Sequence, residues 1–194
     1  MKPRPWKLEW KDGADVLGAR ETSCREVARH ARALAGWYNE DHNRSMLDHA
    51  EKLAPADVRQ SFRDMRRSGR VFLLYFNGEL MGDADFRGIR TGTAEFAIMI
   101  GPRSSQGKGL GTRFSILMHA FAFRVLHAER VYLTIVAGNA AGKRCYEKVG
   151  YVVDESPAAR AYADAATDVA MSLTREEFER RHAAALAQIQ IARG

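Results

Sequence analysis

The stretch that decides the fold is SSQGKGLGTRF, residues 104–114. It places glycine at positions 107, 109 and 111, and an apolar run follows. The segment before it, Thr93–Ile100, has the composition of a strand. Unpaired N–H groups at a helix N-terminus attract anions, and glycine lets a phosphate come close. The order of strand, glycine loop and helix therefore predicts a pyrophosphate cradle. A tight turn with a glycine-rich helix start is the alternative.

Two common nucleotide loops do not fit this stretch. The GxxxxGK[ST] pattern of a P-loop is absent. The stretch contains GxGxG rather than the GxGxxG of a dinucleotide fold, and Glu129 precedes a strand instead of ending one. The strands before the loop also read as an antiparallel hairpin, with Asn77-Gly78 as its turn. The sequence therefore argues against both ATP-type and NAD-type binding.

The elements after the loop alternate between helix and strand. An apolar helix is expected from Gly109 to about His127, packed on a sheet and largely buried. Asn139 is a favourable N-cap and Gly150 a favourable stop for a second helix. Strands are expected on both sides of that helix and after a loop at 155–167, at residues 131–137, 151–154 and 168–173.

The two ends of the chain are less regular. Helices are expected at 23–40 and 55–69, with a poorly periodic segment between them. The first 22 residues are expected to be irregular apart from a short strand at Lys7–Trp10. Thr174–Glu177 is a capping box that opens a helix to about Ala192. We expect one domain over 1–194, with 174–194 as a helical extension that packs on the same domain or forms a dimer contact.

Composition sets the class of protein. The chain has 194 residues, a net charge of +6 and no apolar run near the ~18 residues that span a bilayer. Its start lacks the apolar centre of a secretory signal, so a cytoplasmic location and no membrane partner are expected. The charge favours an anionic partner such as a phosphorylated cofactor, although basic residues are spread along the chain. Cys24 and Cys145 are expected to be free buried thiols, and no ligand cluster predicts a metal.

Two motifs resemble one known family. QGKGLG, residues 106–111, resembles the [RQ]xxGx[GA] acetyl-CoA motif of the GNAT N-acetyltransferase superfamily. NAAGKRCYEKVGY, residues 139–151, is similar to the family's second signature, with Gly142 where alanine is usual. The resemblance covers about 70–173. It implies an α/β (α+β) fold whose mixed, mostly antiparallel central sheet is splayed at the acetyl-CoA site and flanked by helices.

The resemblance also implies roles for individual residues. Backbone groups of the loop would hold the pyrophosphate, and the end of the preceding strand and Asn139 would contact the pantetheine arm. Tyr146 would protonate the departing CoA thiolate. The residues expected to bind acetyl-CoA are Ile98, Met99, Ile100, Gln106, Gly107, Lys108, Gly109, Leu110, Gly111, Thr112, Asn139, Gly142 and Tyr146. Independently, the spacing of Asn139, Gly142 and Tyr146 puts them on one helix face.

The reaction needs a base, because an alkyl amine is mostly protonated at pH 7. Glu95, on the strand that leads to the loop, is the first candidate. Asp83 and Asp85 alternate onto one face of the neighbouring strand and are the other candidates, alongside water alone. His119, in the middle of the apolar helix, is expected to be structural.

The acceptor amine is the least defined part. The family shapes its acceptor site from segments that map to Trp37–Arg44 and Ser156–Thr167. WYNEDHNRSM, residues 37–46, resembles the branch of ribosomal-protein N-terminal, polyamine and amino-sugar acetyltransferases, and the substrate-binding candidates are Trp37, Tyr38, Glu40 and Asp41. A protein N-terminus, a polyamine, an amino sugar or an aminoglycoside all stay open as acceptors. A non-catalytic acyl-CoA sensor and a nucleic-acid-binding domain are the alternatives of another class.

Overall fold

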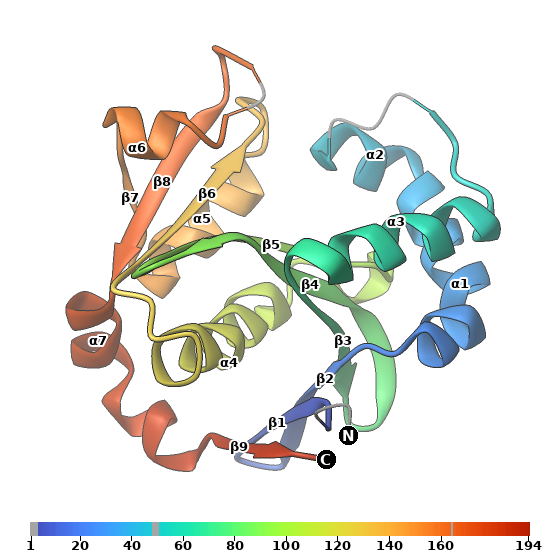
Figure 1. Ribbon diagram of the computed structural model, residues 1–194, viewed down its shortest axis with the longest axis horizontal. Coiled ribbons are helices and arrows are strands. Elements are labelled where there is room, and N and C mark those ends of the chain that lie inside the picture. The colour runs from blue at the N-terminus through green and yellow to red at the C-terminus, as the bar shows by residue number, and fades with distance from the viewer. Residues whose placement is uncertain (1–3, 48–50, 164) are drawn as a thin grey trace.

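The structure is a computed structural model that describes residues 4–47, 51–163 and 165–194. Within these residues one sheet of nine strands has the order β7-β8-β6-β5-β4-β3-β2-β1-β9 (Figure 1). Every neighbouring pair is antiparallel except β5 and β6, which are parallel. The strands are β1 (Trp6–Asp12), β2 (Asp15–Glu21), β3 (Arg70–Phe76), β4 (Glu79–Arg90), β5 (Thr93–Ile100), β6 (Arg130–Ile135), β7 (Val152–Val153), β8 (Val169–Thr174) and β9 (Gln190–Arg193).

Helices cover both faces of this sheet (Figure 1). The α4 helix packs under β1, β2 and β5 and contacts α5 and α7, while α1 and α3 pack together over β3 and β4. The helices are α1 (Cys24–Asn39), α2 (Asp41–Leu47), α3 (Pro55–Ser68), α4 (Leu110–Arg124), α5 (Ala140–Val149), α6 (Pro157–Arg160) and α7 (Arg175–Gln188), with a short 3-10 turn at Arg103–Ser105. The predicted mixed, mostly antiparallel sheet flanked by helices is confirmed.

The core has two parts because the central strands are buried on both faces. Along β3, Phe72 and Leu74 pack with Phe121 of α4 in the larger cluster. Val71 and Leu73 point the other way and pack with the apolar sides of α1 and α3. Successive strand residues face opposite sides of a sheet, so the unbroken run VFLLYF fits a strand covered on both faces.

The N-terminal segment differs from expectation. Residues 6–21 form a hairpin, β1 and β2, rather than an irregular stretch with one short strand. Gly13 turns the chain at φ +65°, a conformation that glycine adopts without steric cost. Leu8 and Trp10 of β1 are buried at alternate positions, and so are Leu17 and Ala19 of β2, which is strand periodicity. Five antiparallel strands therefore precede the glycine loop, rather than three.

The C-terminal segment also differs. The expected helix to Ala192 ends at Gln188, and Gln190–Arg193 forms β9, which pairs with β1 at the edge of the sheet. Pairing with β1 gives these last residues backbone partners that a frayed helix end would lack. Phe178 and Leu186 of α7, and Ile189 after it, are buried in the main core. The apolar side chains of α7 therefore pack against the core of the same chain, which is the first of the two arrangements expected for this extension.

Two short helices, α2 and α6, lie in segments for which no element was predicted. Each has fewer than eight residues, too short for a periodic pattern to be read. Cys24 is exposed, which contradicts the expectation of two buried thiols, while Cys145 is partly buried.

Candidate functional site

The strands β5 and β6 part within the sheet. They pair only at Thr93–Glu95 against Arg130–Tyr132, although β5 continues to Ile100 and β6 to Ile135. On its other side β5 stays paired with β4 as far as Ile100. From Phe96 to Ile100, the edge of β5 that faces β6 is therefore not paired with it, and the two strands diverge (Figure 1). We call the space between the diverging strands the opening. The expected splay is present, and it begins next to Glu95.

The glycine loop closes one end of that opening. Gly107 and Gly109 have φ of +73° and +80°, and a Cβ on either would meet nothing within 4 Å. Glycine is therefore required here by the backbone conformation, while the space above the loop stays open. Gly109 is the N-cap of α4 and brings no side chain to the helix start. The first N–H groups of α4, from Leu110 to Thr112, are thus left for an external acceptor.

The loop is held in place by Gln106. Its Nε2 donates to the carbonyl of Ile100 at 2.8 Å and to Oδ1 of Asn43 at 2.7 Å. The Asn43 Nδ2 donates in turn to the carbonyls of Trp37 and Gly101, at 2.9 and 3.1 Å. Asn43 is buried and ties α2, the end of β5 and the loop together. The sequence analysis did not single out Asn43, because two of its three partners, Gly101 and Gln106, lie far from it in the chain.

The loop also contacts α5. The Thr112 hydroxyl donates to Sγ of Cys145 at 3.4 Å, and a Cβ on Gly111 would lie 3.2 Å from that sulfur. Leu110 is buried in the core, so it anchors the first turn of α4 from below. Lys108 is exposed at the tip of the loop. The two family-like motifs are thus brought into direct contact.

At the start of α5, Asn139 and Gly142 form the helix cap. Asn139 Oδ1 accepts from the Gly142 N–H at 2.7 Å. A Cβ at position 142 would lie 2.8 Å from the Asn139 amide atoms, closer than side chains tolerate. Glycine at this position therefore makes room for the capping side chain of Asn139.

Tyr146 lies one turn further along α5 and is buried. Burial raises the pKa of its phenol, the neighbouring Cys145 and Asp85 act in the same direction, and Arg87 opposes them. The phenol therefore stays protonated at neutral pH. Its ring meets the ring of Tyr151 edge to face, with centroids 5.7 Å apart.

Behind Tyr146, a buried pair fixes the ring of Tyr151. The Tyr151 hydroxyl lies 2.5 Å from Nε2 of His119, and Nδ1 of His119 lies 2.7 Å from the carbonyl of Ser115. Since a carbonyl can only accept, Nδ1 carries the proton and Nε2 accepts from Tyr151. Burial lowers the pKa of His119 to about 4, so the imidazole is neutral. His119 is structural, as expected.

Carboxylates line the sheet face beneath α1. Asp83, Asp85 and Arg87 alternate along β4, and Arg87 faces Glu95 across the β4–β5 pair. Arg87 Nε lies 3.1 Å from Asp85 Oδ1 and 3.7 Å from Glu95 Oε2. The Tyr38 hydroxyl donates to Asp83 Oδ1 at 2.8 Å. All three candidate bases therefore belong to one polar row that continues to the point where β5 and β6 part.

Two members of this row have perturbed acidity. Burial raises the pKa of Asp83 to about 7, with the hydrogen bond from Tyr38 lowering it and the charge of Asp85 raising it. Burial also raises the pKa of Asp85, against the opposing effect of Arg87. Asp83 Oδ2 is buried and has no hydrogen-bond partner among the described residues. Such shifts are concentrated at functional sites.

The four acceptor candidates fall into two groups. The Trp37 ring covers Gly101, where a Cβ would lie 2.1 Å from it, and Tyr38 reaches Asp83, so both border the site. Glu40 instead accepts from the Asn43 N–H at 3.0 Å and caps α2. Asp41 lies 3.5 Å from Arg44 with 95% of its side chain exposed. Trp37 and Tyr38 therefore lie at the site. Glu40 and Asp41 instead make local contacts at the start of α2, Glu40 with the Asn43 N–H and Asp41 with Arg44.

The second segment expected to shape the acceptor site, residues 156–167, packs against β6. Tyr162 stacks on Tyr132 of β6 with centroids 5.4 Å apart, and a Cβ on Gly88 of β4 would lie 3.1 Å from its ring. The loop after α6 therefore reaches across β6 to β4; its residue 164 lies outside the described residues. The described ranges contain no group of three or more His, Cys, Asp or Glu able to hold a metal, and no helix in them is long and apolar enough to cross a bilayer.

A protein-family model described as an acetyltransferase (GNAT) domain matches residues 4–152, which is more than half of the chain. The chain belongs to the GNAT acetyltransferase family. The match extends further toward the N-terminus than the resemblance of the two motifs, and includes α1, α2 and α3. A comparison with curated protein sequences found no match to the acetyltransferase.

Solved structures share the fold of this acetyltransferase. RimJ from Mycobacterium smegmatis in complex with CoA-disulfide is 16% identical with a TM-score of 0.73, over 96% of this chain and 99% of that one. The aminoglycoside enzyme AAC(6')-Ib, in complex with paromomycin and acetyl-CoA, is 21% identical with a TM-score of 0.70, over 84% and 96%. Spermidine N-acetyltransferase from Vibrio cholerae, in complex with CoA and spermine, is 18% identical with a TM-score of 0.67, over 84% and 97%.

Proposed function

We propose that the acetyltransferase moves an acetyl group from acetyl-CoA to a primary amine by direct attack, with Tyr146 as the general acid. The observation that carries this proposal is that the unpaired edge of β5 runs directly into the open glycine loop. The start of α4 contacts α5, the helix of the buried Tyr146, through the hydrogen bond from Thr112 to Cys145. Solved structures that share the fold are complexes with CoA-disulfide, acetyl-CoA or CoA, which supports the choice of donor.

The donor would lie along the opening. Backbone N–H groups of residues 106–112 would hold its pyrophosphate, with Lys108 adding a cation. The backbone of Ile98, Met99 and Ile100 would bind the pantetheine arm in the place that a strand would occupy. Asn139 uses its Oδ1 to cap α5, so its Nδ2 is the group that would donate to a pantetheine carbonyl.

The chemistry follows from the groups at the opening. A base removes a proton from the acceptor ammonium, and the neutral nitrogen attacks the thioester carbonyl. The tetrahedral intermediate then collapses, the carbon–sulfur bond breaks, and the CoA thiolate takes the proton of Tyr146. The nitrogen of the intermediate loses its extra proton to become the amide, and this proton returns through water to the Tyr146 phenolate. Because burial raises the pKa of Tyr146, its phenol is a weak acid that donates a hydrogen bond until charge has built up on sulfur.

We propose Glu95 as the base. It lies at the residue where β5 leaves β6, which is where the thioester would meet an acceptor coming from the α1 side. Asp83 is the competitor, since its pKa of about 7 suits a base at neutral pH. Asp83 is also fully buried and bonded to Tyr38, so it would act through water or hold the ammonium in place.

The acceptor would be cationic. The row of Asp83, Asp85 and Glu95 contains three carboxyl groups against the single guanidinium of Arg87, so the field at the opening favours an ammonium. A protein N-terminus is proposed first, with Trp37 and Tyr38 bordering its path. Polyamines and aminoglycosides are the alternatives, since two solved structures that share the fold are complexes with spermine and with paromomycin. Glu40 and Asp41 would not contact the acceptor, and would attract its ammonium group only through the negative charge that they add near the end of α1.

The test replaces Tyr146 by phenylalanine. The variant should lower kcat by about 100-fold or more, the usual contribution of a positioned acid, and leave the Kd of acetyl-CoA unchanged. Glu95→Gln should remove the acidic limb of the kcat/KM profile, while Asp83→Asn should leave that limb in place. Unchanged turnover in Tyr146→Phe would remove Tyr146 as the acid. Binding of acetyl-CoA without turnover of any amine would favour the acyl-CoA sensor instead.

A further inference from the structure

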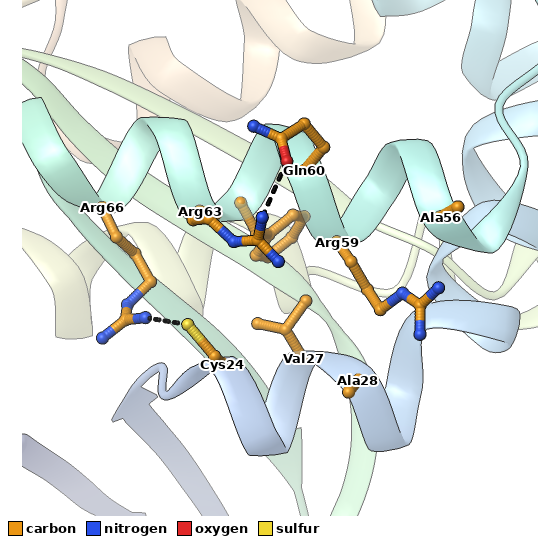
Figure 2. A pocket seen from close by; sticks show the side chains of 9 residues that line it. Cys24, Val27, Ala28, Ala56, Arg59, Gln60, Arg63 and Arg66 are labelled. Carbon is orange, nitrogen blue, oxygen red and sulfur yellow. Dashed lines mark hydrogen bonds between the residues drawn. The ribbon is translucent and has the colours of Figure 1, made fainter.

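A hollow lies between α1 and α3 (Figure 2). These two helices cover the face of the sheet opposite to α4. The volume of the hollow is about 270 Å³, and none of its lining residues belongs to the opening between β5 and β6. The apolar floor consists of the buried side chains of Val27 from α1 and Phe62 from α3. The rim carries Cys24, Arg59, Arg63 and Arg66, with Gln60 beside them.

Among the described residues, the three arginines of the rim have no carboxylate partner. Figure 2 shows Arg63 bonded to Gln60 and Arg66 bonded to Cys24, with Nη1 to Oε1 and Nη1 to Sγ distances of 2.9 Å each. Neither acceptor is a carboxylate. Arg59 extends from α3 toward α1. Across the part of the chain that the structure describes, no carboxylate lies within ion-pair distance of Arg59, Arg63 or Arg66.

The nearby acids are engaged elsewhere. Asp64 pairs with Arg67 at 2.8 Å and accepts from Gln60 at 2.7 Å. Asp57 accepts from the Ala54 N–H at 2.7 Å at the start of α3. Glu26 closes the capping box of α1. The positive charge on the rim is therefore not offset by the carboxylates of the same two helices.

The geometry concentrates this charge on one side of the hollow. Arg59, Arg63 and Arg66 lie four and three residues apart, so they share one face of α3. Arg66 meets Cys24, the first residue of α1, so the charge of α3 lies across the hollow against the start of α1. A guanidinium group presents two N–H donors in the geometry of a carboxylate or phosphate.

We propose that this hollow binds a small organic anion. Arg59, Arg63 and Arg66 would hold its phosphate or carboxylate group, and a compact apolar body would lie on Val27 and Phe62. The volume sets the size of the ligand, because pockets for drug-sized molecules start at about 300 Å³. CoA and dinucleotides are therefore too large, and the site is distinct from the proposed acetyl-CoA site.

The test is calorimetric titration of the whole protein, with CoA in excess so that anion binding at the glycine loop is suppressed. The probes are phenyl phosphate, benzoate, inorganic phosphate and the neutral benzyl alcohol. Phenyl phosphate and benzoate should bind, inorganic phosphate should bind at least about fivefold more weakly than phenyl phosphate, and benzyl alcohol should not bind. Phenyl phosphate against benzoate compares the two possible head groups. Inorganic phosphate and benzyl alcohol show what the apolar floor and the charge contribute separately.

The double variant R59Q/R63Q should weaken phenyl phosphate binding by about tenfold or more. Arg29→Gln is the matched control, because Arg29 lies on α1 but its charge acts on Tyr75 instead of the hollow. Arg29 is exposed and does not line the hollow, so its substitution should change the Kd by less than about twofold. Absence of binding by both aromatic anions, equal binding of benzyl alcohol, or equal losses in R59Q/R63Q and R29Q would overturn the proposal.

Discussion

The Tyr38 hydroxyl donates a hydrogen bond of 2.8 Å to Oδ1 of Asp83, which joins the C-terminal end of α1 to the polar row on β4. This bond lowers the pKa of Asp83, while burial raises it to about 7. Removing the hydroxyl in Tyr38→Phe should therefore move the pKa of Asp83 further up. The carboxyl carbon shift of Asp83, followed by NMR from pH 5 to 9, measures this directly. A midpoint that stays in place or falls would contradict the assigned hydrogen bond.

The same carboxyl makes stability depend on pH. The pKa of Asp83 is about 7 in the folded chain against about 3.9 when unfolded, so the folded state holds the proton more tightly. Its contribution to stability is fully present below about pH 4 and is lost as the pH rises through about 7. The loss is at most about 4 kcal/mol for a shift of three units.

Asp83→Asn should remove that dependence. Between pH 4 and 7 the slope of the free energy of unfolding against pH, measured by urea unfolding, should be more positive in the variant than in the wild type. The comparison is made between the two proteins because His119, whose pKa burial lowers to about 4, contributes a slope of opposite sign in both. Asp85 acts in the same direction as Asp83 because burial raises its pKa too, so some slope should remain. Equal slopes in the two proteins would mean that Asp83 is not the group that holds the proton.

The glycine loop offers a test of backbone conformation. Gly107→Ala and Gly109→Ala each place a Cβ at positive φ, which costs about 1–2 kcal/mol although the space is open. The loop should relax and its N–H groups should turn, so the affinity for acetyl-CoA should fall about tenfold. Gly36→Ala is the matched control, because Gly36 lies within α1 with nothing near its Cβ position. That control should gain up to about 1 kcal/mol of stability and keep its affinity.

Gly142→Ala separates stability from binding. Alanine improves helix propensity by about 1 kcal/mol, but its Cβ displaces the Asn139 cap, which is worth a similar amount. The free energy of unfolding should therefore change by less than about 1 kcal/mol. The affinity for acetyl-CoA should fall, since Asn139 is proposed to contact the pantetheine arm. Thermal unfolding and a binding titration on the same sample give both numbers, and an unchanged affinity would remove Asn139 from the donor site.

Residues close in sequence could be predicted, and those joined by long-range packing could not. Asn139, Gly142 and Tyr146 lie within two turns of one helix, so their shared face follows from helical spacing. Asn43 takes its role from the carbonyl of Gly101 and from Gln106, which no local pattern encodes. The assignment of bases also needed the register of β4 against β5, because the pairing of Arg87 with Glu95 depends on it.

The C-terminal segment illustrates the same limit. Ala185, Leu186 and Ile189 have helical spacing, and the sequence accordingly predicts a helix to Ala192. The chain instead leaves the helix at Gln188, since an unpaired edge of β1 lies within reach and accepts β9. Tertiary hydrogen bonds outweigh local propensity there.

The central claim is that this acetyltransferase uses acetyl-CoA to acetylate a cationic primary amine at the opening between β5 and β6. The most direct measurement is thiol release from acetyl-CoA against peptides with different N-termini, polyamines, amino sugars and aminoglycosides, with Tyr146→Phe beside the wild type. We predict release with at least one class of amine, and a rate about 100-fold lower in the variant. No release with any amine, in a protein shown to bind acetyl-CoA, would contradict the catalytic account.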